Sequence, residues 1–156
     1  MLKVGQDAPS FEAVASNGKT VKLSEYRDKK NVVLFFYPKD FTKVCTAEVC
    51  GFRDMYVDLS GKDTEVIGVS LDSDASHEKF ATQHKVPYPL VADKERKLAK
   101  SYEAVGGLGG IIGITKRITY VIDKGGKVVG AFDGTFDADP HLGGVRETIA
   151  KLSAKA

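Results

Sequence analysis

The chain has 156 residues, of which 42% are hydrophobic, and a net charge of +2 from 23 basic and 21 acidic residues. A chain of this length buries roughly 68–70% of its unfolded surface, so it can form a core without disulfides, and we expect a single domain spanning residues 1–156. The charges are interspersed and no run of 18 apolar residues occurs, which argues against nucleic-acid partners and against a membrane-spanning helix.

Short strands are predicted first along the chain. Asn17-Gly18 separates Phe11–Val14 from Thr20–Leu23, and this pattern is typical of a hairpin turn between two strands. The continuous apolar run Asn31–Tyr37 predicts a central strand that is buried on both faces. Thr64–Leu71 has the same pattern and predicts a second central strand.

Helices are predicted between and after these strands, over residues Thr42–Leu59, Ala75–His84, Lys94–Tyr102 and His141–Ala154. The last of them carries an apolar stripe at helical spacing, which should pack on a sheet. Ile118–Asp123 and Lys127–Asp133 flank Lys124-Gly125-Gly126 and predict strand, turn and strand. We therefore expect an α/β, thioredoxin-like fold, with a central mixed β-sheet flanked by helices and an N-terminal hairpin extension.

Three further patterns carry less information. Gly18-Lys19-Thr20 resembles the end of a phosphate-binding loop, but Ala13 stands where that motif requires glycine. The glycine-rich residues 106–113 do not have the spacing of a dinucleotide-binding loop, so we expect a flexible loop beside a site. The histidines, His77, His84 and His141, are scattered, and no C-x₂-C pair is present, so we expect no metal site.

The two cysteines lie close together, at Cys45 and Cys50, and the chain start MLKVGQDAPS lacks the pattern of a signal peptide. We therefore expect a soluble cytoplasmic protein, in which closely spaced cysteines are more often catalytic or metal-binding than structural. A helix places residues five apart at about 8–9 Å between Cα atoms, beyond the roughly 7 Å that a disulfide tolerates. A bridge between these cysteines would therefore require the helix to unwind. The alternative is two small hydrophobic residues on the core side of a helix.

The position of Cys45 favours its ionised form. Pro38 keeps Tyr37 extended, so the helix begins after a short loop in which Asp40 or Thr42 can cap it. Cys45 then falls in or near the first turn, where unpaired backbone N–H groups and the helix dipole favour a thiolate over a thiol. The hydroxyl of Thr42 is within reach of the sulfur or of an oxygen bound to it.

These residues resemble a known signature. The pattern P-x-x-x-T-x-x-C, formed by Pro38, Thr42 and Cys45, is similar to that of the peroxiredoxins, thiol peroxidases of the AhpC/TSA family with a thioredoxin-like fold. The C-x₄-C spacing to Cys50 resembles the Q type, also called bacterioferritin comigratory protein. The similarity extends along nearly the whole chain, through VGQDAPSFEA, NGKTVKLSEYRDKKNVVLFFYPKDFT, VIGVSLDS, PYPLVAD and RITYVIDKGGKVV.

The resemblance implies a role for each matching residue. Cys45 would be the peroxidatic cysteine, which attacks the peroxide and becomes a sulfenic acid. Thr42 would orient the peroxide and Pro38 would shield the sulfenic acid from water. Arg117 would stabilise the thiolate, and Glu48 would hold the arginine.

The resemblance also implies that Cys50 resolves the sulfenic acid into an intramolecular disulfide, which thioredoxin or a similar dithiol protein then reduces. No metal, haem or flavin cofactor is implied, and relatives of this type are often monomeric, so we expect a monomer with a weak dimer as the alternative. Lys43-Val44 departs from the Pro-Gly that is common in close relatives, which should stiffen the active-site loop.

Two other functions remain open from the residues alone. A thiol–disulfide oxidoreductase would use the same fold, although that chemistry usually employs C-x-x-C. A redox sensor or partner-binding module would use the Cys45–Cys50 switch to alter a surface rather than to remove peroxide. Turnover with a reductant distinguishes an enzyme from this last class.

Overall fold

The computed structural model describes residues 1–108, 111–134 and 137–154. Its helices are α1 (Lys43–Gly61), α2 (Asp74–His84), α3 (Lys97–Ser101) and α4 (Asp139–Ala154), with a 3₁₀ turn, η1, at Leu23–Tyr26. Its strands are β1 (Glu12–Val14), β2 (Thr20–Lys22), β3 (Asn31–Phe36), β4 (Thr64–Ser70), β5 (Leu90–Ala92), β6 (Val105–Leu108), β7 (Ile111–Thr115), β8 (Ile118–Ile122) and β9 (Val128–Asp133). None of the described helices is long and apolar enough to cross a membrane.

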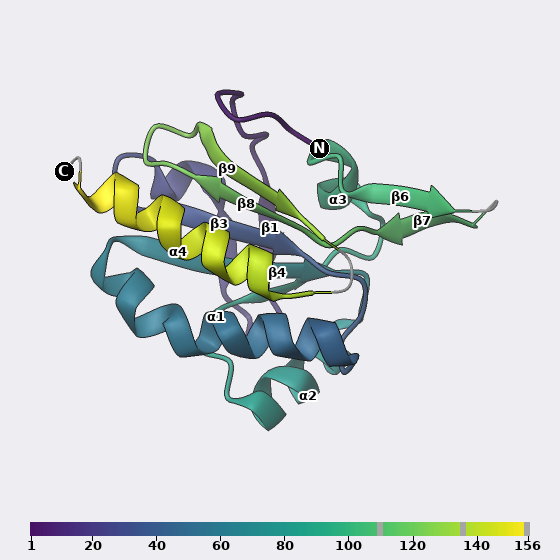
Figure 1. Ribbon diagram of the computed structural model, residues 1–156. Helices are drawn as coiled ribbons and strands as arrows, with labels where there is room; N and C mark the ends of the chain where they lie inside the picture. Colours follow the sequence, from purple (N-terminus) through teal and green to yellow (C-terminus); the bar gives the residue numbers. More distant parts are fainter. Residues whose placement is uncertain (109–110, 135–136, 155–156) are drawn as a thin grey trace.

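A five-stranded mixed sheet with the order β5-β4-β3-β8-β9 forms the centre of the molecule (Figure 1). The pairs β3–β4 and β4–β5 are parallel, whereas β3–β8 and β8–β9 are antiparallel. Every residue of β3, β4 and β8 is buried, and for β3 and β4 the apolar runs of the sequence predicted this. The expected thioredoxin-like arrangement is confirmed, and it places the end of β3 near the middle of the sheet.

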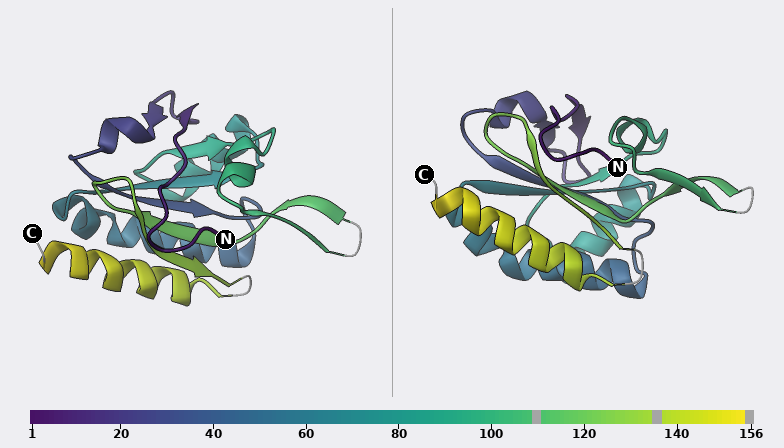
Figure 2. Two further views of the ribbon diagram at one scale, coloured as in Figure 1. Left: turned by 90° about the horizontal axis from the view of Figure 1, so that it is seen from above. Right: turned by 45° about the horizontal axis from the view of Figure 1, so that its top comes forward.

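The two faces of the sheet are covered by different elements because side chains alternate along each strand. Val33 and Phe35 of β3 pack under the helices α1, α2 and α4, while Leu34 and Phe36 pack under the N-terminal segment, η1 and α3. Both views of Figure 2 show α1 and α4 side by side on one face. A Cβ atom at Gly51 would overlap the Leu142 side chain, so glycine at this position permits the close approach of α1 and α4.

The N-terminal hairpin is confirmed, with β1 and β2 paired antiparallel. Three other expectations were incomplete. The three-residue strand β5 was not predicted, since it is too short for a period and directly follows Pro87 and Pro89. Residues 106–113 were expected to form a loop, but β6 and β7 pair antiparallel and project from the sheet (Figure 1), while Gly109 and Gly110 lie outside the described residues. The helix expected over Lys94–Tyr102 is limited to Lys97–Ser101.

Candidate active site

The segment between β3 and α1 is fixed by a buried aspartate. Asp40 Oδ1 accepts a hydrogen bond from the Tyr37 hydroxyl at 2.6 Å, and Oδ2 lies 2.7 Å from His77 Nδ1 and 2.9 Å from Ser76 Oγ. The Asp40 backbone N–H also donates to Asp72 Oδ2 at 2.8 Å. Asp40 therefore anchors the loop to α2, and it does not cap α1 as the sequence suggested.

In the sequence His77 is one of three scattered histidines for which no shared site was expected. In the structure it belongs to this buried group. Ligand-type atoms of Asp40, Asp72 and His77 lie within 4.8 Å of one another. Each of them already makes hydrogen bonds within the protein, including one from Ser70 Oγ to Asp72 Oδ2 at 2.6 Å. The arrangement is that of a structural hydrogen-bond network that holds the loop.

Thr42 is the N-cap residue of α1 in extended conformation, but its side chain makes no capping hydrogen bond. The Thr42 hydroxyl instead donates to the carbonyl oxygen of Lys39 at 2.8 Å, so the expected side-chain cap is absent. Cys45 occupies the third helical position of α1, and the N–H groups of the first turn have no partner further back in the helix. The positive end of the helix thus lies beside the Cys45 sulfur.

Arg117 joins the cysteine to a carboxylate. Its Nη2 donates to Cys45 Sγ at 3.0 Å and its Nη1 donates to Glu48 Oε1 at 2.9 Å. Cys45, Glu48 and Arg117 are all buried, with exposed fractions of 1%, 0% and 4%. The structure therefore brings together three of the residues that the sequence singled out, although they come from segments about 70 positions apart.

Glu48 has further partners that sequence reasoning missed. Its Oε2 lies 3.5 Å from Thr119 Oγ1 and 3.4 Å from His141 Nδ1. Burial raises the pKa of Glu48 to about 7, while the charge and hydrogen bonds of Arg117 and the hydrogen bond of Thr119 act in the lowering direction. Arg117 directly precedes β8 and Thr119 lies within it, two positions later. Side chains two positions apart in a strand point to the same face, so this spacing could have indicated Thr119.

Cys50 lies one and a half turns further along α1 and is half-buried, and both cysteines are free thiols. Burial raises the pKa of the Cys50 thiol, with a smaller lowering effect of Arg53. The helix around it is fastened to its surroundings, because the Tyr88 hydroxyl donates to Val49 O at 2.6 Å. In addition, Arg53 Nη1 donates to His84 O at 2.8 Å. The helix is intact between the two cysteines, so a bridge between them remains a prediction.

Pro38, the last of the sequence-derived site residues, directly follows Tyr37 beyond the end of β3 and is partly buried. It therefore stands in the loop that leads to Cys45.

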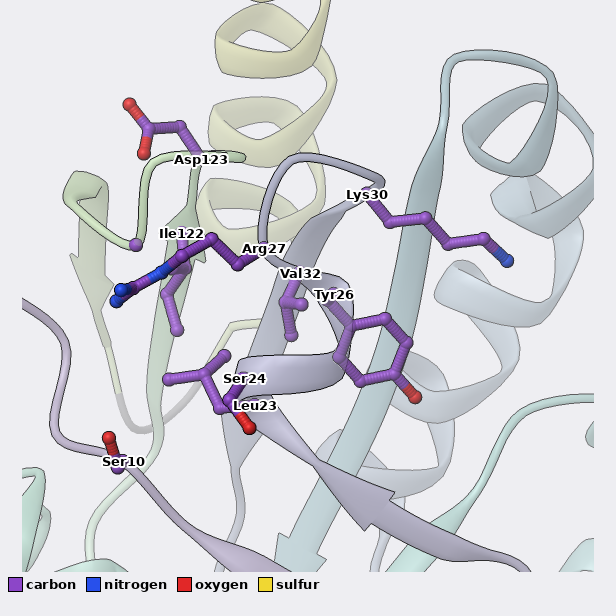
Figure 3. Close-up of a pocket in the computed structure, with 10 residues that line it drawn as sticks. Ser10, Leu23, Ser24, Tyr26, Arg27, Lys30, Val32, Ile122 and Asp123 are labelled. Carbon is purple, nitrogen blue, oxygen red and sulfur yellow. The ribbon is translucent and has the colours of Figure 1, made fainter.

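A separate hollow lies on the opposite face of the sheet. Figure 3 shows its lining, which includes Leu23, Arg27, Val32 and Ile122 from η1, the segment after it, β3 and β8. Leu23, Val32 and Ile122 belong to the core on the side away from α1 and α4. No cysteine is among the residues that line it, and Cys45 belongs to the core on the other face.

A thioredoxin-like fold in which a buried cysteine in the first turn of a helix accepts a hydrogen bond from an arginine beside a central strand defines a class of thiol-dependent redox proteins. Residues 4–131 match the family model of the AhpC/TSA family. The chain belongs to this family, and the relatives described next are peroxiredoxins.

Two curated relatives illustrate the similarity. Peroxiredoxin Bcp of Bacillus subtilis (strain 168) is 37% identical over 157 residues, which cover 99% of this chain and 99% of that protein. The chloroplastic peroxiredoxin Q of Arabidopsis thaliana is 41% identical over 150 residues, covering 96% of this chain and 67% of that protein.

Solved structures agree. Peroxidoxin BcpB from Mycobacterium tuberculosis superimposes with a TM-score of 0.87 at 32% identity, covering 100% of this chain and 99% of that chain. Xanthomonas campestris peroxiredoxin Q gives a TM-score of 0.84 at 26% identity, with 92% and 91% covered. The resemblance to Q-type peroxiredoxins and the enzyme class expected from it, a thiol-dependent peroxidase, are confirmed.

Proposed function

We propose that the single domain of residues 1–156 reduces hydrogen peroxide and organic hydroperoxides through Cys45. The observation that carries the proposal is the 3.0 Å hydrogen bond from Arg117 to the buried Cys45 sulfur, because a cationic donor at this distance favours the thiolate. The thiolate attacks one peroxide oxygen and the O–O bond breaks. The bonding pair leaves on the second oxygen, which takes a proton and departs as water or an alcohol, while Cys45 becomes a sulfenic acid. Donors aimed at the developing charge lower the barrier of such a step.

The positions of Thr42 and Pro38 support roles in binding the peroxide. Both lie in the loop that Asp40 anchors, immediately before the turn of α1 that carries Cys45. In the proposal the Thr42 hydroxyl exchanges the Lys39 carbonyl for a peroxide oxygen, and Pro38 shields the sulfenic acid. Glu48 holds Arg117 in place by accepting a 2.9 Å hydrogen bond from Arg117 Nη1 at Oε1.

Cys50 resolves the sulfenic acid in the next step. Its sulfur attacks the sulfur of Cys45, an S–S bond forms and the hydroxyl group leaves as water. The first turns of α1 have to open for this step, because an intact helix holds the Cα atoms of the two cysteines about 8–9 Å apart, too far for a disulfide. Early resolution protects Cys45 from irreversible oxidation to sulfinic acid.

Peroxiredoxins are recycled by thioredoxin-type reductants, and we propose thioredoxin or a similar dithiol protein for this chain. We also propose that the enzyme is a monomer located in the cytoplasm. The plant relatives are named as chloroplastic, so the location is a separate proposal from the activity.

The test is rapid-quench mass spectrometry of the reduced protein with one equivalent of hydrogen peroxide, with alkylation of the remaining thiols at each time. We expect both thiols to disappear together and a Cys45–Cys50 disulfide to appear in the peptide map. The matched variants are Cys50→Ser, which should oxidise as fast as the unaltered protein, retain the sulfenic acid and convert it to sulfinic acid when excess peroxide is added, and Cys45→Ser, which should not react. Oxidation of Cys45 no faster than that of a free thiol would overturn the proposal.

A further inference from the structure

His141 is a buried residue that the proposed mechanism does not use. It lies in the first turn of α4, and neither its side chain nor that of Glu48 has any exposed surface. Its Nε2 lies 3.0 Å from the carbonyl oxygen of Gly134, and its Nδ1 lies 2.8 Å from Thr119 Oγ1 and 3.4 Å from Glu48 Oε2. Three segments besides α4 therefore converge on this imidazole, one of them the helix that carries Cys45.

The hydrogen-bond partners determine where the imidazole carries its proton. A carbonyl oxygen can only accept, so Nε2 must be the protonated nitrogen facing Gly134. In a neutral imidazole Nδ1 is then an acceptor, and it faces the carboxylate Oε2 of Glu48, which also accepts. Thr119 has a single hydroxyl hydrogen and can donate it to only one of these two acceptors, Nδ1 or Oε2. A favourable contact between Glu48 and His141 therefore needs one additional proton between them.

Charge counting gives the same result. A Cys45 thiolate, an ionised Glu48 and the Arg117 guanidinium would together carry a net single negative charge in a site where all three are buried. Uncompensated buried charge is unfavourable. One proton held by Glu48 and His141 makes the group neutral while the sulfur is ionised.

We propose that His141 is a positioning residue of the peroxidase site, which holds with Glu48 the one proton that balances the Cys45 thiolate. The proton that leaves the Cys45 thiol is thus retained at the Glu48–His141 pair. When the sulfur is oxidised it loses its negative charge, Arg117 and an ionised Glu48 balance each other, and the pair releases the proton. That proton matches the one gained by the departing oxygen of the peroxide, so charge is conserved through the step.

The direction of the pKa shifts agrees with this assignment. Burial raises the pKa of Glu48 to about 7 and burial lowers that of His141, so the shared proton resides mainly on the carboxyl oxygen and points at Nδ1. Other titratable groups also act on the pair. Arg117 beside β8, Asp133 at the end of β9 and Asp137 before α4 act on His141 through their charges. The charge of Glu48 also acts on the Tyr88 phenol, whose pKa is raised well above its usual value mainly by burial.

The inference rests on the proposed role of Cys45, and the first experiment keeps the two apart because it uses no peroxide. The ultraviolet absorbance of the thiolate is followed against pH in reduced protein that carries Cys50→Ser, so that only Cys45 is observed. His141→Gln retains a donor for Gly134 O but provides no acceptor at the Nδ1 position. We expect it to move thiolate formation about one pH unit higher, which is about tenfold less thiolate below the midpoint.

Two further variants distinguish this role from a structural one. His141→Asn places an amide at the Nδ1 position and gives up the Gly134 contact, so it should shift the midpoint less than His141→Gln does. A residue that only fixes the Gly134 segment would show the reverse order. In a Glu48→Gln background, His141→Gln should cause no further shift, because no proton remains to be shared.

An equal shift with and without the Glu48 carboxylate, or no shift in a folded His141→Gln protein, would overturn the inference. Nitrogen NMR of labelled histidine provides a test in protein whose His141 is unchanged, should the His141 variants fail to fold. We expect His141 to carry its proton on Nε2 and its Nδ1 signal to follow the ionisation of Cys45. A proton on Nδ1 alone, or a signal that does not respond to Cys45, would refute the assignment. Normal titration combined with slow peroxide consumption would instead contradict the proposed function.

Discussion

The hydrogen bond from Tyr88 to Val49 O should restrain the opening of α1. Val49 lies between the two cysteines, and a disulfide cannot form until this part of the helix unwinds. The bond is buried and 2.6 Å long, and such a bond contributes about 1 kcal/mol net. Tyr88→Phe removes it while keeping the ring, so the open form should be populated about fivefold more. Disulfide formation should accelerate by the same factor, and the reaction of Cys45 with peroxide should not change.

The assay is stopped-flow measurement of two phases after mixing reduced protein with peroxide, with the peptide map assigning the second phase to the disulfide. Tyr102→Phe is the matched control, since its hydroxyl donates to Pro9 O at 2.5 Å on the opposite face of the sheet. This control should lower the free energy of unfolding by a similar amount, about 1 kcal/mol, and leave both phases unchanged. Equal acceleration in the two variants would refute a local role for Tyr88, as would a Tyr88→Phe protein that forms the disulfide no faster.

Three other predictions concern the buried charges. Cys45→Ser should abolish the fast reaction with peroxide, because burial raises the pKa of Cys50 and keeps it a thiol; a fast residual reaction traced to Cys50 by alkylation would contradict this. Arg117→Lys should slow the first oxidation by about 10²-fold, since one ammonium group cannot replace two guanidinium nitrogens that bind a sulfur and a carboxylate at once. Single-turnover measurement of the oxidation rate tests this, and an unchanged rate would contradict it. Glu48, with its pKa raised to about 7 from 4.5, contributes stability that is fully present below about pH 4.5 and lost as the pH rises through about 7. Relative to Glu48→Gln, the unaltered protein should therefore lose about 1–3 kcal/mol of unfolding free energy between about pH 5 and pH 8, measured by urea unfolding. His141 contributes with the opposite sign, as its lowered pKa makes its contribution disappear when the pH falls, and it is present in both proteins. An identical pH dependence of the two proteins would show that Glu48 is ionised throughout.

The central strands were predictable because burial on both faces leaves a continuous apolar run. Asn31–Tyr37 and Thr64–Leu71 match β3 and β4 within one residue at each end. The strand β5 has only three residues, and so short a segment carries no period that distinguishes it from a loop. The β6–β7 pair was hidden by its glycines, which weaken any strand pattern.

The site was predictable where its residues are close in sequence. The spacing of Pro38, Thr42 and Cys45 identified the loop, and the resemblance added Glu48 and Arg117. The contacts of His141 could not be predicted, because they depend on how α4 docks against α1. Asp40 was one of two candidate caps, and nothing in the sequence reveals that it binds His77 of α2 instead.

The buried anchor at Asp40 also sets how far the catalytic sulfur can travel. If the first turns of α1 unwind while Asp40 keeps its partners, Cys45 remains on a tether of five residues, whose fully extended length is about 17 Å. The oxidised cysteine would thus stay over the same end of the sheet throughout the cycle. A reducing partner would meet the disulfide at a surface defined in advance by α2, which holds the fixed end of the tether.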